Sequence, residues 1–323
     1  MSKPRVVVTR RWPEEVEAQL AEHFDVQLNP DDRPLDRDSL KEAFASADAV
    51  FSTVTDRIDA EVLATDPIRA RLIGNFGVGF NNIDVTSAKA RGLVVTNTPE
   101  VLTDATADLA MTLLLSVARR GGEGERHLRS GSWSGWRPTH MMGTQVTGKT
   151  LGLIGFGRIG QAVARRARWG FEMRVLFFDP SPPGSDVLRD LGAEQSQSIE
   201  AVLEASDFVS LHCPATPENR HLINAERLRL MKPEAFLINT ARGDVVDEAA
   251  LNDALQETVI AGAGLDVFEE EPRVTPGLLD RENVVLLPHL GSATRETRVA
   301  MGLKVLENAR AFFGGAEPPN RVA

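Results

Sequence analysis

Polar side chains with complementary chemistry follow three apolar segments in the second half of the chain. Arg242 comes after F-L-I-N-T-A, a run of three glutamates after G-L-D-V-F, and His289 after V-V-L-L-P. An arginine can bind a carboxylate through paired N–H donors, and an imidazole can give or take a proton near neutral pH. A glutamate on the other ring nitrogen, from Glu269, Glu270 or Glu271, would fix the histidine tautomer and favour its charged form. Together these groups suit reduction of a 2-keto acid, with the proton from His289 and the anion held by Arg242.

A glycine-rich turn at 151–160, L-G-L-I-G-F-G-R-I-G, joins an apolar strand pattern to a helical one. Gly155 suits the tight turn, Gly157 the close approach of a pyrophosphate, and Gly160 the packing of helix on strand. The next apolar run ends at Asp179, about 20 residues downstream, where dinucleotide-binding folds place a ribose-binding carboxylate. The turn predicts dinucleotide binding. If the segment were an ordinary strand–turn–helix without a ligand, the spacing between its glycines and Asp179 would be accidental.

The same three chemical groups also have structural interpretations. An arginine after a strand is often a surface ion pair, a lone histidine is often structural, and a glutamate run is usually a solvated turn. Their common position at strand ends beside the glycine turn favours a site, because ligands of open α/β sheets bind beyond the carboxyl ends of the strands.

The first third of the chain alternates apolar strand patterns with amphipathic helix patterns. This alternation predicts a parallel sheet covered on both faces. The expected strands are 5–9, 24–28, 49–52, 71–75 and 93–96, and the expected helices are 13–23, 36–47, 58–64 and 85–91.

One long helix is expected at 103–129, followed by an irregular segment at 130–148 that is rich in Gly, Trp and Pro. A second alternating series begins at the glycine turn, with strands expected at 175–178, 208–212, 235–239, 259–266 and 284–288. A final helix at 295–313 could return to the first domain. The fold class is therefore α/β, with two doubly wound parallel-sheet domains.

The composition is that of an ordinary globular protein of 323 residues, with 46 acidic residues against 36 basic ones and a net charge of −10. Such a surface disfavours nucleic acid and anionic membranes as partners. The single cysteine, Cys213, excludes an internal disulfide, and no targeting or membrane-spanning segment is evident, so a reducing cytoplasmic location is expected. His212 lies beside Cys213, but no further ligand spacing supports a metal site.

The ordered set of motifs resembles the D-isomer-specific 2-hydroxyacid dehydrogenase family along nearly the whole chain. The matching stretches are G-V-G-F-N-N-I-D at 77–84, N-T-P at 97–99, T-D-A-T-A-D at 103–108, the glycine turn, H-C-P at 212–214, N-T-A-R-G at 239–243, D-V-F-E-E-E-P at 266–272 and P-H-L-G-S-A-T at 288–294. Within the family the chain most resembles the glyoxylate/hydroxypyruvate reductase group, on W-S-G-W-R-P at 133–138 and S-T-V-T-D-R-I-D at 52–59.

The resemblance implies catalytic roles at matching positions. Arg242 would bind the carboxylate and keto oxygen of the substrate. His289 would be the general acid in reduction, with Glu271 as its partner. Backbone N–H groups of Val78 and Gly79 would hold the substrate carboxylate.

The resemblance also implies a cofactor cleft and a domain plan. Asp266 would bind the nicotinamide carboxamide, and Arg158 and Ile159 would flank the pyrophosphate. The remaining cleft residues would be Thr106, Cys213, Thr240, Ala241, His289 and Gly291, beside the three glycines and Asp179. A flavodoxin-like substrate domain would comprise 1–99 plus 291–323, a Rossmann-type NAD-binding domain would comprise 100–290, and the chain would form a homodimer.

The cofactor preference is predicted from Asp179-Pro180-Ser181, because a carboxylate there would repel the 2′-phosphate of NADP; NAD(H) is expected. At Phe80-Asn81-Asn82 the chain departs from the commoner family pattern, and tuned packing near the substrate is expected. Trp133 and Trp136 either reach a neighbouring subunit's active site or pack the dimer surface.

The leading hypothesis is NADH-dependent reduction of glyoxylate and hydroxypyruvate to glycolate and D-glycerate. Alternatives within the same chemistry are D-lactate and 2-ketogluconate reductases, which pocket residues near Val54, Thr55 and Phe80 would distinguish. A further alternative is a phosphoglycerate dehydrogenase. A different class, a dinucleotide-sensing corepressor, stays open because such relatives can retain Arg242, Glu271 and His289.

Overall fold

The computed structural model describes residues 2–323, which form two compact units. Of the described residues, the first unit comprises 2–102 with Ala293–Ala323, and the second Thr103–Ser292. The boundaries between the two units, at 102/103 and 292/293, lie two or three residues from those expected from the sequence. Among the described residues no helix is both long and apolar enough to cross a membrane.

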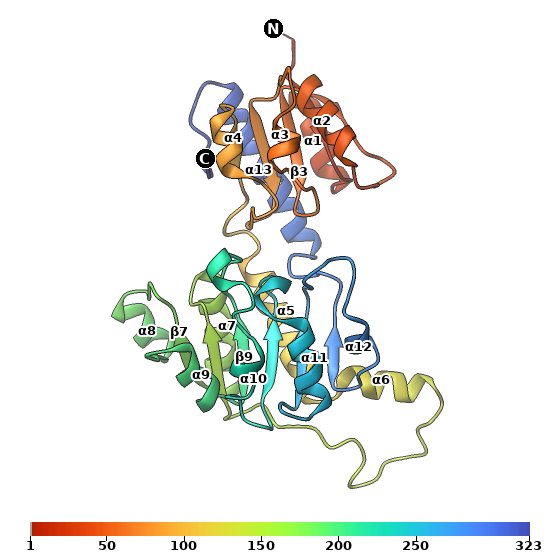
Figure 1. Ribbon diagram of the computed structural model, residues 1–323, viewed down its shortest axis with the longest axis vertical. Coiled ribbons are helices and arrows are strands. Elements are labelled where there is room, and N and C mark those ends of the chain that lie inside the picture. Colours follow the sequence, from red (N-terminus) through yellow and green to blue (C-terminus); the bar gives the residue numbers. More distant parts are fainter. Residues whose placement is uncertain (1) are drawn as a thin grey trace. The chain divides into compact units, whose positions relative to one another are not determined.

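The first unit, in which Figure 1 labels β3 and the helices, is built on a parallel five-stranded sheet in the order β2-β1-β3-β4-β5. Its strands are β1 (Arg5–Val8), β2 (Asp25–Gln27), β3 (Ala49–Thr53), β4 (Leu72–Phe76) and β5 (Val94–Thr96). Its helices are α1 (Glu14–His23), α2 (Arg37–Ser46), α3 (Ala60–Leu63), α4 (Val85–Ala90) and α13 (Arg295–Phe313). This strand order is flavodoxin-like, with its topological switch point between β1 and β3.

Alternate residues of each strand in this sheet meet different helices, as period-two geometry requires. Val7 and Ile73 pack with α2, α3 and α4 on one face, whereas Val6 and Phe51 pack with α1 and α13 on the other. The last helix of the chain therefore completes the core begun by the first strand, which is why the first unit is discontinuous.

The second unit contains a parallel seven-stranded sheet in the order β12-β11-β10-β9-β6-β7-β8. Its strands are β6 (Thr150–Ile154), β7 (Arg174–Phe178), β8 (Ala193–Gln195), β9 (Phe208–Leu211), β10 (Phe236–Asn239), β11 (Gly262–Leu265) and β12 (Val284–Leu286). Its helices are α5 (Thr103–Ala118), α6 (Gly121–Arg129), α7 (Arg158–Phe171), α8 (Ser185–Leu191), α9 (Ile199–Ala205), α10 (Ala225–Leu228), α11 (Glu248–Gln256) and α12 (Pro276–Leu279), with 3₁₀ turns η1 (Pro217–Asn219) and η2 (Gly243–Val245).

This is the Rossmann-type order, with the switch point between β6 and β9. One face is covered by α5 and α7, through residues such as Leu113 and Val163, and the other by α9, α10 and α11, through residues such as Val202 and Leu251. The fold class expected from the sequence, two doubly wound parallel-sheet units, is confirmed.

The single helix expected at 103–129 is wrong in one respect, because the structure divides it into α5 and α6. Arg120 takes a left-handed backbone conformation (φ 53°) between them. Three glycines follow at 121, 122 and 124, and glycine is among the poorest residues for continuing a helix. The strand β8, at the sheet edge, was not anticipated from the sequence.

Candidate active site

His289 and Glu271 form a hydrogen-bonded pair at the carboxyl ends of β12 and β11. The imidazole Nδ1 lies 2.8 Å from Glu271 Oε2, and each side chain is about one-third exposed (31% and 32%). His289 has a left-handed backbone (φ 55°), and its N–H donates to the carbonyl of Asp266 at 2.9 Å. A non-glycine residue held in this conformation needs support from its surroundings, and such residues are concentrated at functional sites.

Glu271 is itself anchored by the loop that carries it. Its Oε1 accepts the N–H of Phe268 at 3.1 Å, while Oε2 faces His289. Burial alone would raise the pKa of Glu271. The hydrogen bond and charge of His289, the Phe268 N–H and the charge of Arg242 outweigh it and hold the pKa below its ordinary value. The pair therefore favours an ionised glutamate facing the imidazole.

Arg242, just after β10, brings a part-buried guanidinium to the same edge of the sheet. Burial lowers the pKa of Arg242, and the carboxylates of Glu271 and Asp244 oppose that shift, so the side chain stays a cation at neutral pH. One guanidinium nitrogen donates to the Ala241 carbonyl at 2.7 Å.

The Arg242 loop is fixed on two sides. Asn239 donates from Nδ2 to the Arg242 carbonyl at 2.9 Å and accepts the Ala241 N–H at 3.0 Å. On the other side, a Cβ at Gly243 would overlap the Phe268 carbonyl group, so only glycine allows this close approach. The loops carrying Arg242 and Glu271 are thus in direct backbone contact.

Glu248, the first residue of α11, is hydrogen-bonded to the loop that carries Glu271. This residue was not identified from the sequence. It is 5% exposed. Its Oε1 accepts the Glu269 N–H at 2.5 Å and its Oε2 accepts the Thr275 hydroxyl at 2.6 Å. A glutamate in a first helical turn is so common that the sequence offers no signal for this role.

Asp266 shapes the segment that follows His289. Its carboxylate accepts the N–H groups of Leu290 at 2.6 Å and Gly291 at 2.8 Å, and the Thr106 hydroxyl donates to the Gly291 carbonyl at 3.0 Å. Burial raises the pKa of Asp266, and these N–H donors oppose the shift. The expected cleft residues Thr106, Asp266, His289 and Gly291 therefore lie in one hydrogen-bonded cluster.

The glycine turn has the geometry of a pyrophosphate cradle. Gly155 is left-handed (φ 91°), and a Cβ there would lie 2.6 Å from the His212 backbone across the switch point. A Cβ at Gly160 would lie 2.5 Å from the Gly155 carbonyl, whereas one at Gly157 would meet nothing within 4 Å. Gly157 caps α7 without a side-chain hydrogen bond, so the first N–H groups of the helix, at Arg158 and Ile159, are suited to an anion.

Asp179 is oriented by this turn at the end of β7. Its Oδ2 accepts the Phe156 N–H at 2.7 Å and its Oδ1 accepts the Ser181 N–H at 2.8 Å. Each carboxylate oxygen keeps a further lone pair for a ribose hydroxyl.

Further along the same edge, the buried Thr240 hydroxyl has no hydrogen-bond partner in residues 2–323. An orphaned polar atom of this kind requires an explanation, and a bound ligand supplies one. With the open cradle at Gly157 and the carboxylate of Asp179, these residues fit a dinucleotide.

Cys213 and His212 follow β9 and are not suited to nucleophilic or metal chemistry. Burial raises the pKa of the Cys213 thiol to about 11 and lowers the pKa of His212 to about 4. His212 Nε2 lies 2.9 Å from the Ser210 hydroxyl. Among the described residues no group of three or more His, Cys, Asp or Glu side chains is arranged to hold a metal ion.

In the first unit, Val78 and Gly79 lie in the loop after β4. The carbonyls of this loop are turned toward side-chain amides: Asn97 donates to the Val78 carbonyl at 2.8 Å, and the fully buried Asn75 donates to the Gly79 carbonyl at 2.9 Å. No hydrogen bond within residues 2–323 uses the N–H of Val78 or Gly79. Successive backbone donors of this kind form an anion-binding nest.

Residues 111–291 match the model of the family described as "D-isomer specific 2-hydroxyacid dehydrogenase, NAD binding domain". The chain belongs to this family.

Several relatives of the family are similar over almost the whole chain. A glyoxylate reductase of Thermococcus kodakarensis is 49% identical, covering 99% of this chain and 96% of its own length, and one of Korarchaeum cryptofilum is 50% identical over the same shares. An NADPH-dependent glyoxylate/hydroxypyruvate reductase of Sinorhizobium meliloti, solved with NADP and malonate, has a TM-score of 0.88 and 37% identity, covering 100% of this chain and 97% of that one.

As a D-2-hydroxyacid dehydrogenase, the chain is an oxidoreductase that depends on a nicotinamide dinucleotide, and the predicted family and enzyme class are confirmed. The matched NAD-binding region lies within the second unit, where the expected catalytic residues Arg242, Glu271 and His289 are brought together.

Proposed function

We propose that this dehydrogenase reduces glyoxylate and hydroxypyruvate with NADH, giving glycolate and D-glycerate. The observation that carries the proposal is the His289–Glu271 pair at 2.8 Å, whose glutamate is also under the charge of the part-buried Arg242. The names of the relatives, glyoxylate reductases and a glyoxylate/hydroxypyruvate reductase, support this choice of substrate.

In this proposal each side chain of the trio has one task. The dinucleotide, when bound, supplies the hydride that reduces the keto carbon. His289 donates a proton from Nε2 to the keto oxygen, because Nδ1 is committed to Glu271. Glu271 stabilises the imidazolium before that transfer and fixes the ring orientation. Arg242 binds the anionic substrate through its paired N–H donors.

We assign the two units different tasks. The second unit, with its glycine turn, Asp179 and Thr240, binds the dinucleotide. The first unit binds substrate, with the N–H groups of Val78 and Gly79 holding the carboxylate. The absence of hydrogen-bond partners for these two donors within residues 2–323 supports this assignment.

We assign NADH as the preferred cofactor on the basis of Asp179. A carboxylate held at the end of β7 by the Phe156 and Ser181 N–H groups would lie where NADP carries a 2′-phosphate. The S. meliloti relative is named NADPH-dependent, so the assay of this chain compares both dinucleotides.

The deciding experiment is a steady-state panel of glyoxylate, hydroxypyruvate, pyruvate, 2-ketogluconate and phosphohydroxypyruvate, each with NADH and NADPH. The proposal expects the highest kcat/KM for glyoxylate or hydroxypyruvate with NADH. A higher value for another keto acid would assign the chain to the corresponding dehydrogenase. Dinucleotide binding without turnover of any of them would favour a sensor role.

We also propose a homodimer. Trp133 and Trp136 are 52% and 82% exposed, and Leu128 and Met142 are exposed nearby along the chain. Large exposed apolar groups of this kind mark interaction surfaces.

The dimer is tested by light scattering coupled to size-exclusion chromatography, which should give twice the mass of one chain. Trp136→Ala should reduce that mass if the tryptophan packs the interface, or raise KM alone if it serves a partner's active site.

A further inference from the structure

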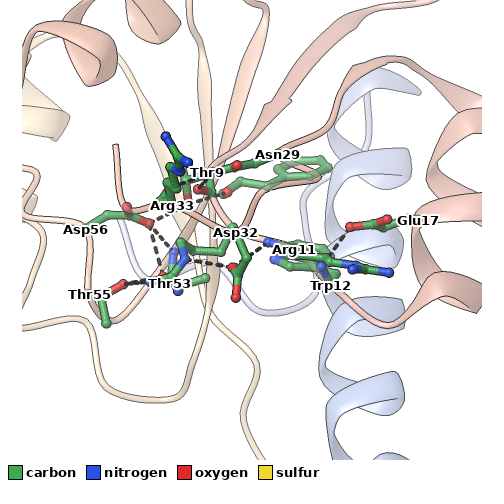
Figure 2. A network of polar contacts seen from close by, with 12 residues as sticks. Thr9, Arg11, Trp12, Glu17, Asn29, Asp32, Arg33, Thr53, Thr55 and Asp56 are labelled. Atoms are coloured by element: carbon green, nitrogen blue, oxygen red, sulfur yellow. Dashed lines mark hydrogen bonds and ion pairs between the residues drawn. The ribbon is translucent and has the colours of Figure 1, made fainter. Parts of the chain in front are cut away.

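A buried carboxylate, Asp56, lies at the switch point of the first sheet, between the carboxyl ends of β1 and β3. It is 2% exposed. Its Oδ2 accepts the Thr9 hydroxyl at 2.5 Å, the Thr53 N–H at 2.6 Å and the Thr53 hydroxyl at 3.2 Å (Figure 2). Thr9 follows β1 and Thr53 ends β3, so one carboxylate ties two adjacent strand ends.

A carboxylate in this position is costly and needs a reason. Burial raises the pKa of Asp56, against the hydrogen bonds from Thr53 and Thr9 and the charge of Arg10. An apolar residue would avoid that desolvation cost. The network therefore stabilises one loop geometry at some cost to the free energy of folding.

The loop held by Asp56 is bonded to the loop that follows Val78 and Gly79. The Asn82 amide nitrogen donates to the carbonyls of Thr53 and Asp56, both at 3.1 Å, which uses both of its hydrogens. The backbone continues the connection, since the Ile58 N–H donates to the Asn82 carbonyl at 2.9 Å.

The network also extends to the tip of its own loop. The Thr53 and Thr55 hydroxyls are 2.9 Å apart, and Arg10 donates to Thr55 at 3.4 Å while its Nε is paired with Asp32 at 2.9 Å. Figure 2 shows Asp56, Thr53 and Thr55 drawn together in this way. Thr55, one of the residues expected to distinguish substrates, is thus ordered through the same carboxylate.

We propose that Asp56 is a positioning residue for the substrate: it fixes the 53–58 loop and, through Asn82, the 77–84 loop that presents the anion-binding N–H groups. The proposal rests on the assignment of Val78 and Gly79 to substrate binding. It places the effect on affinity for the keto acid, not on dinucleotide binding, because every contact in the network lies within the first unit.

The test compares Asp56→Ala with Asp56→Asn and with a control, Asp59→Ala. Asp56→Ala should raise KM for glyoxylate and hydroxypyruvate about tenfold, as expected for the loss of about one well-placed hydrogen bond. NADH affinity, measured by fluorescence titration, should change by less than about twofold. Asp56→Asn should recover most of the wild-type KM, since its Oδ1 can accept from Thr53 and Thr9.

Asp59 is a matched control because it lies three residues further on but caps α3, accepting the Val62 N–H at 3.1 Å and pairing with Arg37. Asp59→Ala should lower Tm and leave both KM values unchanged. The proposal is overturned if Asp59→Ala raises KM as much as Asp56→Ala, or if Asp56→Ala leaves KM unchanged.

A second variant and a second readout keep the test decisive if Asp56→Ala folds poorly. Asn82→Ala removes the bridge between the loops and should raise KM to a similar extent. In both variants amide hydrogen exchange within 77–84 should accelerate relative to wild type, and unchanged exchange would also overturn the proposal. Wild-type inactivity toward every keto acid, with exchange still accelerated in the variants, would instead refute the proposed function alone.

Discussion

Nδ1 of His289 lies 2.8 Å from Oε2 of Glu271, whereas the two preceding glutamates make no contact with this ring. Glu269 is bonded to Arg220 and His221, both at 2.7 Å, and Glu270 to Arg273 at 2.6 Å. The three adjacent carboxylates therefore have different partners, and Glu271 is the one bonded to the His289 imidazole.

His289→Ala should remove the proton donor and lower kcat by about 10² to 10⁴. Glu271→Gln should have a smaller effect, about 10 to 10², because the ring keeps a hydrogen-bond partner but loses the charge that stabilises the imidazolium. Steady-state kinetics with saturating NADH measures both effects, with near-ultraviolet circular dichroism as the check on folding. Near wild-type kcat in His289→Ala would remove the histidine from the chemistry.

The acid limb of the stability profile should depend on Glu271. Its pKa is depressed in the folded state, so the stabilisation it contributes is present above its ordinary pKa near 4.5 and is lost as pH falls through the folded value. Urea unfolding at pH 7 and pH 3 should show a smaller difference for Glu271→Gln than for wild type. An equal difference in the two proteins would show that other carboxylates account for the acid sensitivity.

Cys213 should be inert toward alkylating reagents at neutral pH. Because burial raises the pKa of its thiol to about 11, the thiolate fraction stays small until the solution is strongly alkaline. The rate of modification by iodoacetamide in the folded protein should therefore still be rising at pH 10. A plateau below pH 9 would contradict this environment for the thiol.

The placement of Arg242, Glu271 and His289 could be predicted from the sequence because each follows a strand, and parallel strands end at one edge of a sheet. Their strands β10, β11 and β12 are neighbours in the sheet, which a doubly wound connectivity favours. The selection of Glu271 among three glutamates came from the resemblance, since strand-end position alone is the same for all of them.

Other features depend on tertiary contacts that leave no local pattern. Glu248 has the appearance of an ordinary first-turn glutamate, and its role comes from the Glu269 N–H and Thr275 hydroxyl, both remote in sequence. Asn75 lies within an apolar strand, and its amide acts on the loop beyond that strand. The break at Arg120 has a local signal in Gly121 and Gly122, and the apolar pattern does not continue beyond it, because Leu128 is the one large apolar residue of α6.

Asp179→Ala should weaken the discrimination between the two dinucleotides. Removing the carboxylate eliminates a ribose acceptor and the repulsion of a 2′-phosphate, so kcat/KM should fall with NADH and rise with NADPH, changing their ratio by about tenfold or more. Thermal unfolding should show a smaller change, because Asp179 is only part-buried at the carboxyl end of β7. A wild-type enzyme that already prefers NADPH would contradict the role assigned to this carboxylate.

Glu248→Ala should impair catalysis without touching the reacting groups. The substitution leaves the Glu269 N–H and the Thr275 hydroxyl without their acceptor, so the loop that holds Glu271 against His289 should loosen. We expect kcat to fall about tenfold, which corresponds to the free energy of about one hydrogen bond, and KM for NADH to stay unchanged. Glu248→Gln should restore most of kcat, because its carbonyl oxygen can accept from Glu269 and its amide can donate to Thr275.

A structural role limited to α11 would instead lower Tm while leaving the pH dependence of kcat as in wild type. A pH profile that moves in Glu248→Ala and returns in Glu248→Gln would establish that Glu248 acts through the His289–Glu271 pair.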